Sequence, residues 1–78
     1  MEYLNGYVQA IIKDLANTVK TVKGNKEAVL NRLEVEFRIL SEIIMYNVGA
    51  KIITTSEGQE LGKMVCKKQE ELEIIAKL

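Results

Sequence analysis

Five large apolar residues in the middle of the chain recur at alternating intervals of three and four positions. They are Leu30, Leu33, Phe37, Leu40 and Ile44. This spacing keeps side chains on one side of an α-helix and is typical of a helix that packs lengthwise against another helix. Asn25 can cap the start of such a helix, and Gly49 can end it. The sequence therefore predicts a helix over residues 26–47, packed along at least one neighbour.

The same segment carries a second apolar row, formed by Val35, Ile39, Ile43 and Tyr46. At 100° per residue this row lies roughly 130° around the helix from the first. A helix with two apolar sides has to be covered from two directions. Either the other two helices of the chain cover one row each, or one row packs within the chain and the other packs on a second protomer.

Helical periodicity also appears on both sides of this segment. Residues 2–22 place Leu4, Val8, Ile11, Leu15 and Val22 at intervals close to the helical repeat, and Lys20 and Lys23 suit the negative end of the helix dipole. Residues 57–77 carry a similar stripe, interrupted by Lys68. Its members are Leu61, Val65, Leu72 and Ile75. Two further helices are therefore predicted, over 2–22 and 57–77.

Residues 50–56 are ambiguous. Ile52 to Thr55 are β-branched, which favours extended backbone, whereas Ser56 followed by Gln59 is a capping-box pattern that starts a helix nearby. The alternative to a third helix is a β-hairpin that pairs residues 50–55 with 61–66.

The length of 78 residues corresponds to a single domain over 1–78 with a small core. One cysteine allows no internal disulfide, and the absence of histidine removes the commonest zinc ligand. Chains of this size without such supports rely on regular helix packing or on association. The predicted fold is all-α, either a three-helix up-down-up bundle or a helical hairpin plus a third helix, and we expect a homodimer to complete it.

Lysine and arginine together equal aspartate and glutamate at 11 each. A dedicated duplex-binding protein usually has a basic excess, so nucleic-acid binding is the alternative function, through a patch of Lys13, Lys20, Lys23 and Lys26. No apolar run approaches the roughly 20 residues that cross a bilayer, so a membrane partner is not expected. The start of the chain shows no signal-peptide pattern, and a lone thiol suits a reducing compartment. A cytoplasmic location is expected.

Catalytic patterns are weak throughout the chain. Cys66 has no histidine to activate it, and its place beside the apolar stripe predicts a half-buried structural thiol. Gly58 to Lys63 is one residue short of a phosphate-binding loop, and Met64 replaces its Ser or Thr. The two glycines, four residues apart, are better explained by close helix packing. We expect no enzyme activity, no cofactor, no metal site and no small-molecule substrate.

The function that these features predict is a small protein–protein interaction module, acting as a regulator, adaptor or inhibitor. Its expected contact surface is the second row of the central helix, Val35, Ile39, Ile43 and Tyr46, which also mediates self-association. Tyr46 and Phe37 are the expected anchors, because aromatic side chains dominate many interfaces.

Overall fold

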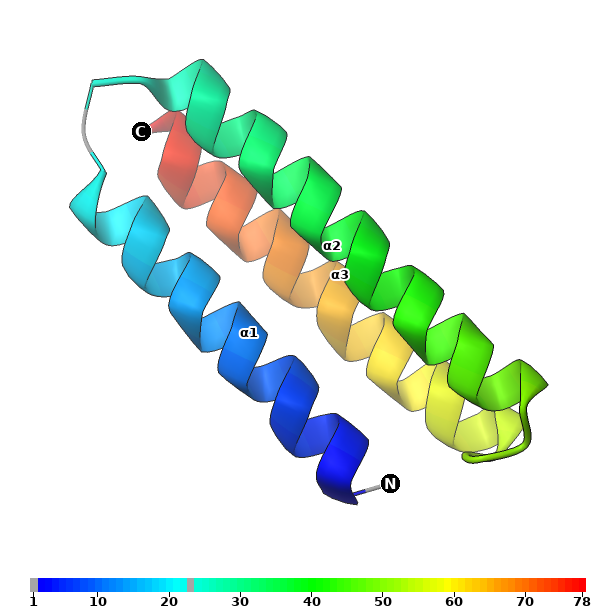
Figure 1. Cartoon of the computed structure of the whole chain (residues 1–78). Helices are drawn as coiled ribbons and strands as arrows, with labels where there is room; N and C mark the ends of the chain where they lie inside the picture. Colours follow the sequence, from blue (N-terminus) through cyan, green and yellow to red (C-terminus); the bar gives the residue numbers. More distant parts are fainter. Residues whose placement is uncertain (1, 23) are drawn as a thin grey trace.

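The computed structural model describes residues 2–22 and 24–78, with the side chain of Glu2 left aside. Three α-helices run up, down and up: α1 (Glu2–Thr21), α2 (Lys26–Gly49) and α3 (Thr55–Lys77), as Figure 1 shows. No strand occurs within these residues, so the alternative of a β-hairpin at 50–66 is wrong. The predicted helices differ from the observed ones by at most two residues at either end.

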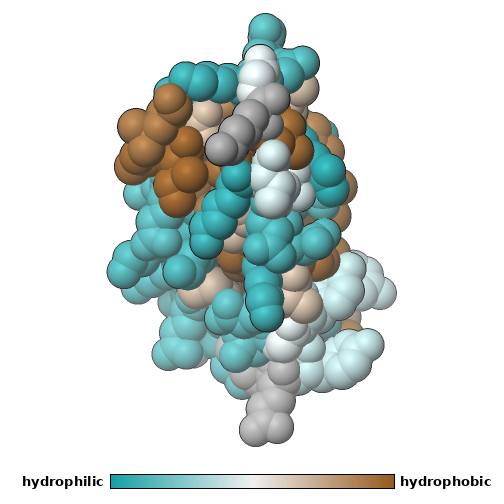
Figure 2. Space-filling model, turned by 90° about the vertical axis from the view of Figure 1, so that its left-hand side faces the viewer, coloured by the Kyte–Doolittle hydropathy of each residue, from teal (hydrophilic) through white to brown (hydrophobic). Residues whose placement is uncertain are grey.

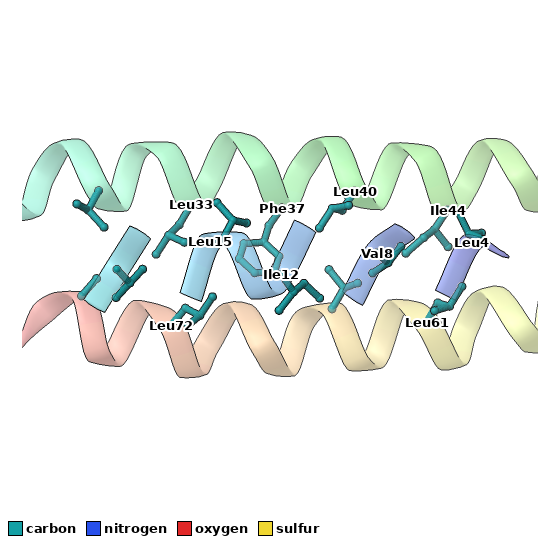
Figure 3. Packing of buried hydrophobic residues seen from close by; sticks show 14 of the residues in the cluster. Leu4, Val8, Ile12, Leu15, Leu33, Phe37, Leu40, Ile44, Leu61 and Leu72 are labelled. Atoms are coloured by element: carbon teal, nitrogen blue, oxygen red, sulfur yellow. The ribbon is translucent and has the colours of Figure 1, made fainter. Parts of the chain in front are cut away.

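The core lies on one side of α2, where both other helices meet it. Phe37 and Leu33 are fully buried there, and Figure 3 shows the Phe37 ring between α2 and α3 with α1 behind. The two helices of the α2–α3 hairpin make the closest packing, and α1 rests on that hairpin with fewer contacts. The buried side chains are Leu4, Val8, Ile12, Leu15, Val19, Val29, Leu33, Phe37, Leu40, Ile44, Ile53, Leu61, Val65, Leu72 and Ala76.

The start of α2 follows the prediction. Asn25 is the N-cap, and its Oδ1 accepts a hydrogen bond from the Ala28 backbone N–H at 3.1 Å. This bond satisfies one of the backbone donors that a helix start leaves unpaired. Gly24, just before it, has a φ of 103°, a conformation that glycine adopts without steric cost.

The end of α2 differs from the prediction. Gly49 is still helical, and the residue with left-handed backbone is Lys51, whose φ is 62°. The Lys51 N–H donates to the Val48 carbonyl, and the Ile52 N–H donates to the Asn47 carbonyl at 2.9 Å. These two bonds form a Schellman motif, which usually has glycine in the left-handed position. The bonds and the burial of Ile53 hold a lysine in that conformation.

The start of α3 is also displaced from the expected position. The N-cap is Thr54, whose Oγ1 accepts from the Glu57 N–H at 3.1 Å, while Glu57 Oε1 accepts from the Thr54 N–H at 2.8 Å. The capping box therefore uses Thr54 and Glu57 and not Ser56 and Gln59. The earlier start fits the burial of Ile53, which lies directly before the cap and joins the core.

Gly58 and Gly62 have different roles. A Cβ on Gly58 would collide with Cγ2 of Val48, whereas a Cβ on Gly62 would meet nothing within 4 Å. Gly58 is therefore the point where α3 approaches the end of α2 most tightly. The prediction that glycine permits close packing is confirmed at Gly58 and is wrong at Gly62.

Two details of α3 differ from its sequence pattern. Ala76 is buried where Ile75 was expected, and Ile75 is exposed. Cys66 is exposed, not half-buried, because it lies about 100° around the helix from Val65. Lys68 extends to the surface, where its Nζ lies 3.3 Å from Glu71 Oε2. The buried residues of α3 therefore lie on the side that faces α2. Near the end of the helix this side no longer coincides with the apolar stripe of the sequence.

We predict opposite effects from alanine at the two glycines. Gly58→Ala should lower the free energy of unfolding by about 1–2 kcal/mol, because the β-branched Val48 has to move. Gly62→Ala should raise it by about 0.5–1 kcal/mol, since alanine restricts the unfolded chain and nothing obstructs it. Urea unfolding followed by circular dichroism measures both. Equal effects in the two variants would show that Gly58 is not a close-packing point.

We also predict a specific acid sensitivity at the start of α3. The Thr54 backbone N–H bonded to Glu57, with a further contribution from the Thr54 hydroxyl, lowers the pKa of this carboxyl. A carboxyl group whose pKa is lower in the folded protein than in the unfolded chain stabilises the fold. This stabilisation is fully present above the pKa of the unfolded chain, about 4.3, and is lost as the pH falls through the pKa of the folded protein. Melting temperatures below pH 5 should therefore fall less steeply in Glu57→Gln than in the wild type. Glu60→Gln, which removes a carboxyl group of the same helix outside the capping box, is the matched control.

Candidate interaction surface

The second apolar row of α2 lies on the side of the helix that faces away from the core. Val35 and Ile39 are each 43% exposed and Tyr46 is 72% exposed, whereas Ile43 is half-buried and packs against the core. Neither α1 nor α3 encloses this row, because both pack on the first row, on the opposite side of α2. The four residues Val35, Ile39, Ile43 and Tyr46 are called the outer face below.

Phe37 does not belong to this surface. Its side chain is 1% exposed and stands among the core residues of all three helices (Figure 3). The expectation that it anchors a partner is therefore corrected, since it cannot reach another molecule while the fold is intact. Tyr46 is the aromatic residue that α2 leaves accessible.

Beside the outer face lies a groove of about 340 Å³ between the start of α1, the end of α2 and the α2–α3 turn. Ile43 lines this groove and so connects it with the outer face. Asn47 also lines it, and its Nδ2 donates to the Ile43 carbonyl at 2.7 Å. The residues that line the groove are Tyr3, Leu4, Tyr7, Ile43, Asn47, Ile52 and Ile53.

Two tyrosines and an isoleucine make the groove strongly apolar at its rim. Tyr3 is 89% exposed, and Tyr7 and Ile52 are also accessible. Sequence reasoning placed none of these three on the predicted interaction surface. Tyr3 and Tyr7 are four residues apart and so share one side of α1, which is a usable signal. Nothing in the sequence brings Ile52 to them, because that proximity depends on how the α2–α3 turn folds back.

The lysines proposed for nucleic acid are only partly brought together. Lys20 and Lys26 line a cleft of about 330 Å³ at the opposite end of the bundle, with apolar walls that include Val22 and Ile75. Lys26 Nζ donates to the Lys77 carbonyl at 3.1 Å, which draws it toward α3. Lys13 does not line this cleft, and Lys23 lies outside the described residues.

Hydrophobic residues gather visibly near this same end. Figure 2 shows them on the side that faces left in Figure 1, near the end that carries the α1–α2 connection and the C-terminus. The cleft there combines apolar walls with two cationic side chains. Base stacking requires aromatic side chains between the positive groups, and none lines this cleft.

Side chains that could bind a metal ion do not cluster in the part of the chain that the structure describes. No three His, Cys, Asp or Glu side chains within it lie close enough together to hold a metal ion. None of its helices combines the length and the apolar character needed to cross a membrane. Comparison with protein-family models, curated proteins and solved structures gives no match.

Proposed function

We propose that this chain is a small protein–protein interaction module that binds through the outer face of α2 and associates with itself there. The observation that supports this most directly is the row of accessible apolar side chains, Val35, Ile39 and Tyr46, on a helix whose other side is already packed. An exposed apolar patch of this kind on a small protein marks an association site.

The free energy available from covering the row is considerable for a chain of this size. Complete burial of a large apolar side chain contributes about 1.5–3 kcal/mol, and the partly covered Val35 and Ile39 would contribute about half of that each. A domain of fewer than about 70–80 residues rarely derives more than about 3–5 kcal/mol from its own core. Association through the outer face would therefore add an appreciable fraction of the total stability.

The surface also has the composition of an interface. Tyr46 on the outer face and Tyr3 and Tyr7 beside the groove are aromatic residues of the kind that dominate binding energy. Ile43 lies between them and joins the two regions into one apolar area.

We predict that Ile39→Glu abolishes association and preserves the fold. A carboxylate placed in the middle of the row would lose its hydration in the complex, whereas in the free chain it stays in water. Sedimentation equilibrium over micromolar to millimolar concentrations measures the association, and circular dichroism measures the helix content. Met45→Glu is the control, since Met45 is an exposed apolar residue of α2 that lies toward α3 and not in the row.

Two results would contradict the proposal. In the first, the wild-type chain remains monomeric at all concentrations, and the proteins that it captures from host extract are the same as those captured by the Ile39→Glu variant. The other is retention on DNA that falls steeply with salt and is lost in Lys20→Glu/Lys26→Glu, which would favour the nucleic-acid alternative. The two lysines that share a cleft are the observation behind that alternative.

A further inference from the structure

The side of α2 that carries the outer face also carries two charged residues, one before the apolar row and one between Ile39 and Tyr46. Arg32 precedes Val35 by three positions and Glu42 follows Ile39 by three, and both are exposed. Along this side of α2 the intervals alternate between four and three from residue 28 to residue 46, as in the seam of a two-helix coiled coil. The seam is formed by Ala28, Arg32, Val35, Ile39, Glu42 and Tyr46.

Charge selects the direction in which a second α2 can pack on this seam. In a parallel, in-register pair each residue faces its own copy, so Arg32 would face Arg32 and Glu42 would face Glu42. Like charges in a helix seam oppose that arrangement. A parallel dimer through the outer face is therefore disfavoured.

An antiparallel pair removes this conflict. With a two-fold axis at the level of residue 37, seam residues equally far before and after that position face each other. Arg32 and Glu42 are each five positions away, and Val35 and Ile39 are each two positions away. Ala28 and Tyr46 are each nine positions away, so the smallest seam residue faces the largest. Every layer of the seam then pairs opposite charges, two apolar residues, or a small with a large side chain.

We propose that the occupant of the outer face is a second copy of this chain, packed antiparallel through α2 with Arg32 of each copy paired to Glu42 of the other. This proposal rests on the proposed function and adds the partner and its orientation. Both α1 and α3 pack on the opposite side of α2 and leave the seam accessible.

Two features make the dimer weak and concentration-dependent. One face of a single helix is smaller than the roughly 800 Å² per partner of a standard interface. Glu36 and Arg38 are each one position from the axis, but they lie on opposite edges of the seam, about 100° to either side of Phe37. The two-fold axis brings each edge against the same edge of the other copy, so Glu36 lies near Glu36 and Arg38 near Arg38. These like charges reduce the affinity without changing the preferred direction, because the parallel arrangement places like charges in the seam itself.

Charge exchange tests the direction. Arg32→Glu and Glu42→Arg should each lower the association constant by about tenfold, because each replaces two attractive contacts of the symmetric dimer with repulsive ones. The double variant Arg32→Glu/Glu42→Arg should restore association to near the wild-type value. The matched control Arg32→Glu/Glu34→Arg has the same net charge but changes an acidic residue off the seam, and it should not restore association. A double variant no better than the single ones would overturn the antiparallel register.

Crosslinking gives an independent readout. In a Cys66→Ser background, Val35→Cys mixed with Ile39→Cys should oxidise mainly to the disulfide between the two different variants. If the pairing is parallel, the disulfide between two Ile39→Cys chains should form in preference to the mixed one. That result would overturn the proposal. Ile39→Glu can abolish association while the double charge variant fails to restore it and no mixed disulfide forms. That combination would support the interaction module and reject this antiparallel dimer. A wild-type chain that is always monomeric would reject the dimer, and a partner protein lost in Ile39→Glu would then still support the module.

Discussion

The packing of α1 and α3 against one side of α2 is the constraint on which the rest of the structure depends. Phe37, Leu33 and Leu40 are each 1% exposed on that side and are the largest fully buried side chains among the described residues. Both neighbouring helices therefore pack on the same row. As a consequence Val35, Ile39 and Tyr46 of the second row remain accessible, whereas Ile43 packs against the edge of the core.

The connection between α2 and α3 sets the geometry of this arrangement. The Schellman motif at Lys51 and the capping box of Thr54 and Glu57 satisfy backbone groups that two helix ends leave unpaired. Ile53 enters the core between them, and Gly58 lets α3 approach Val48. The same turn carries Ile52 to the start of α1, so a purely structural device also shapes the groove beside the outer face.

Sequence reasoning succeeded where one helix could be considered by itself. The three helices, the Asn25 cap and the buried row around Phe37 all follow from local spacing and local hydrogen bonding. It failed where two competing local signals were available. Thr54 and Ser56 can both start a helix, and the choice of Thr54 depends on Ile53 being drawn into the core. Ala76 and not Ile75 lies in the core for a related reason. The way the helices pack decides which side of α3 meets α2, and the size of the residue does not.

The sequence by itself determined that α2 is a helix with two apolar rows and that the chain has no disulfide to support a small core. Only the tertiary structure decided that the row around Phe37 is enclosed, that Val35, Ile39 and Tyr46 are left accessible, and that Tyr3, Tyr7 and Ile52 lie around a groove beside them. The physical reason is that helical periodicity places residues around one axis but carries no information about which neighbour covers each side. That choice depends on contacts between residues far apart in the chain.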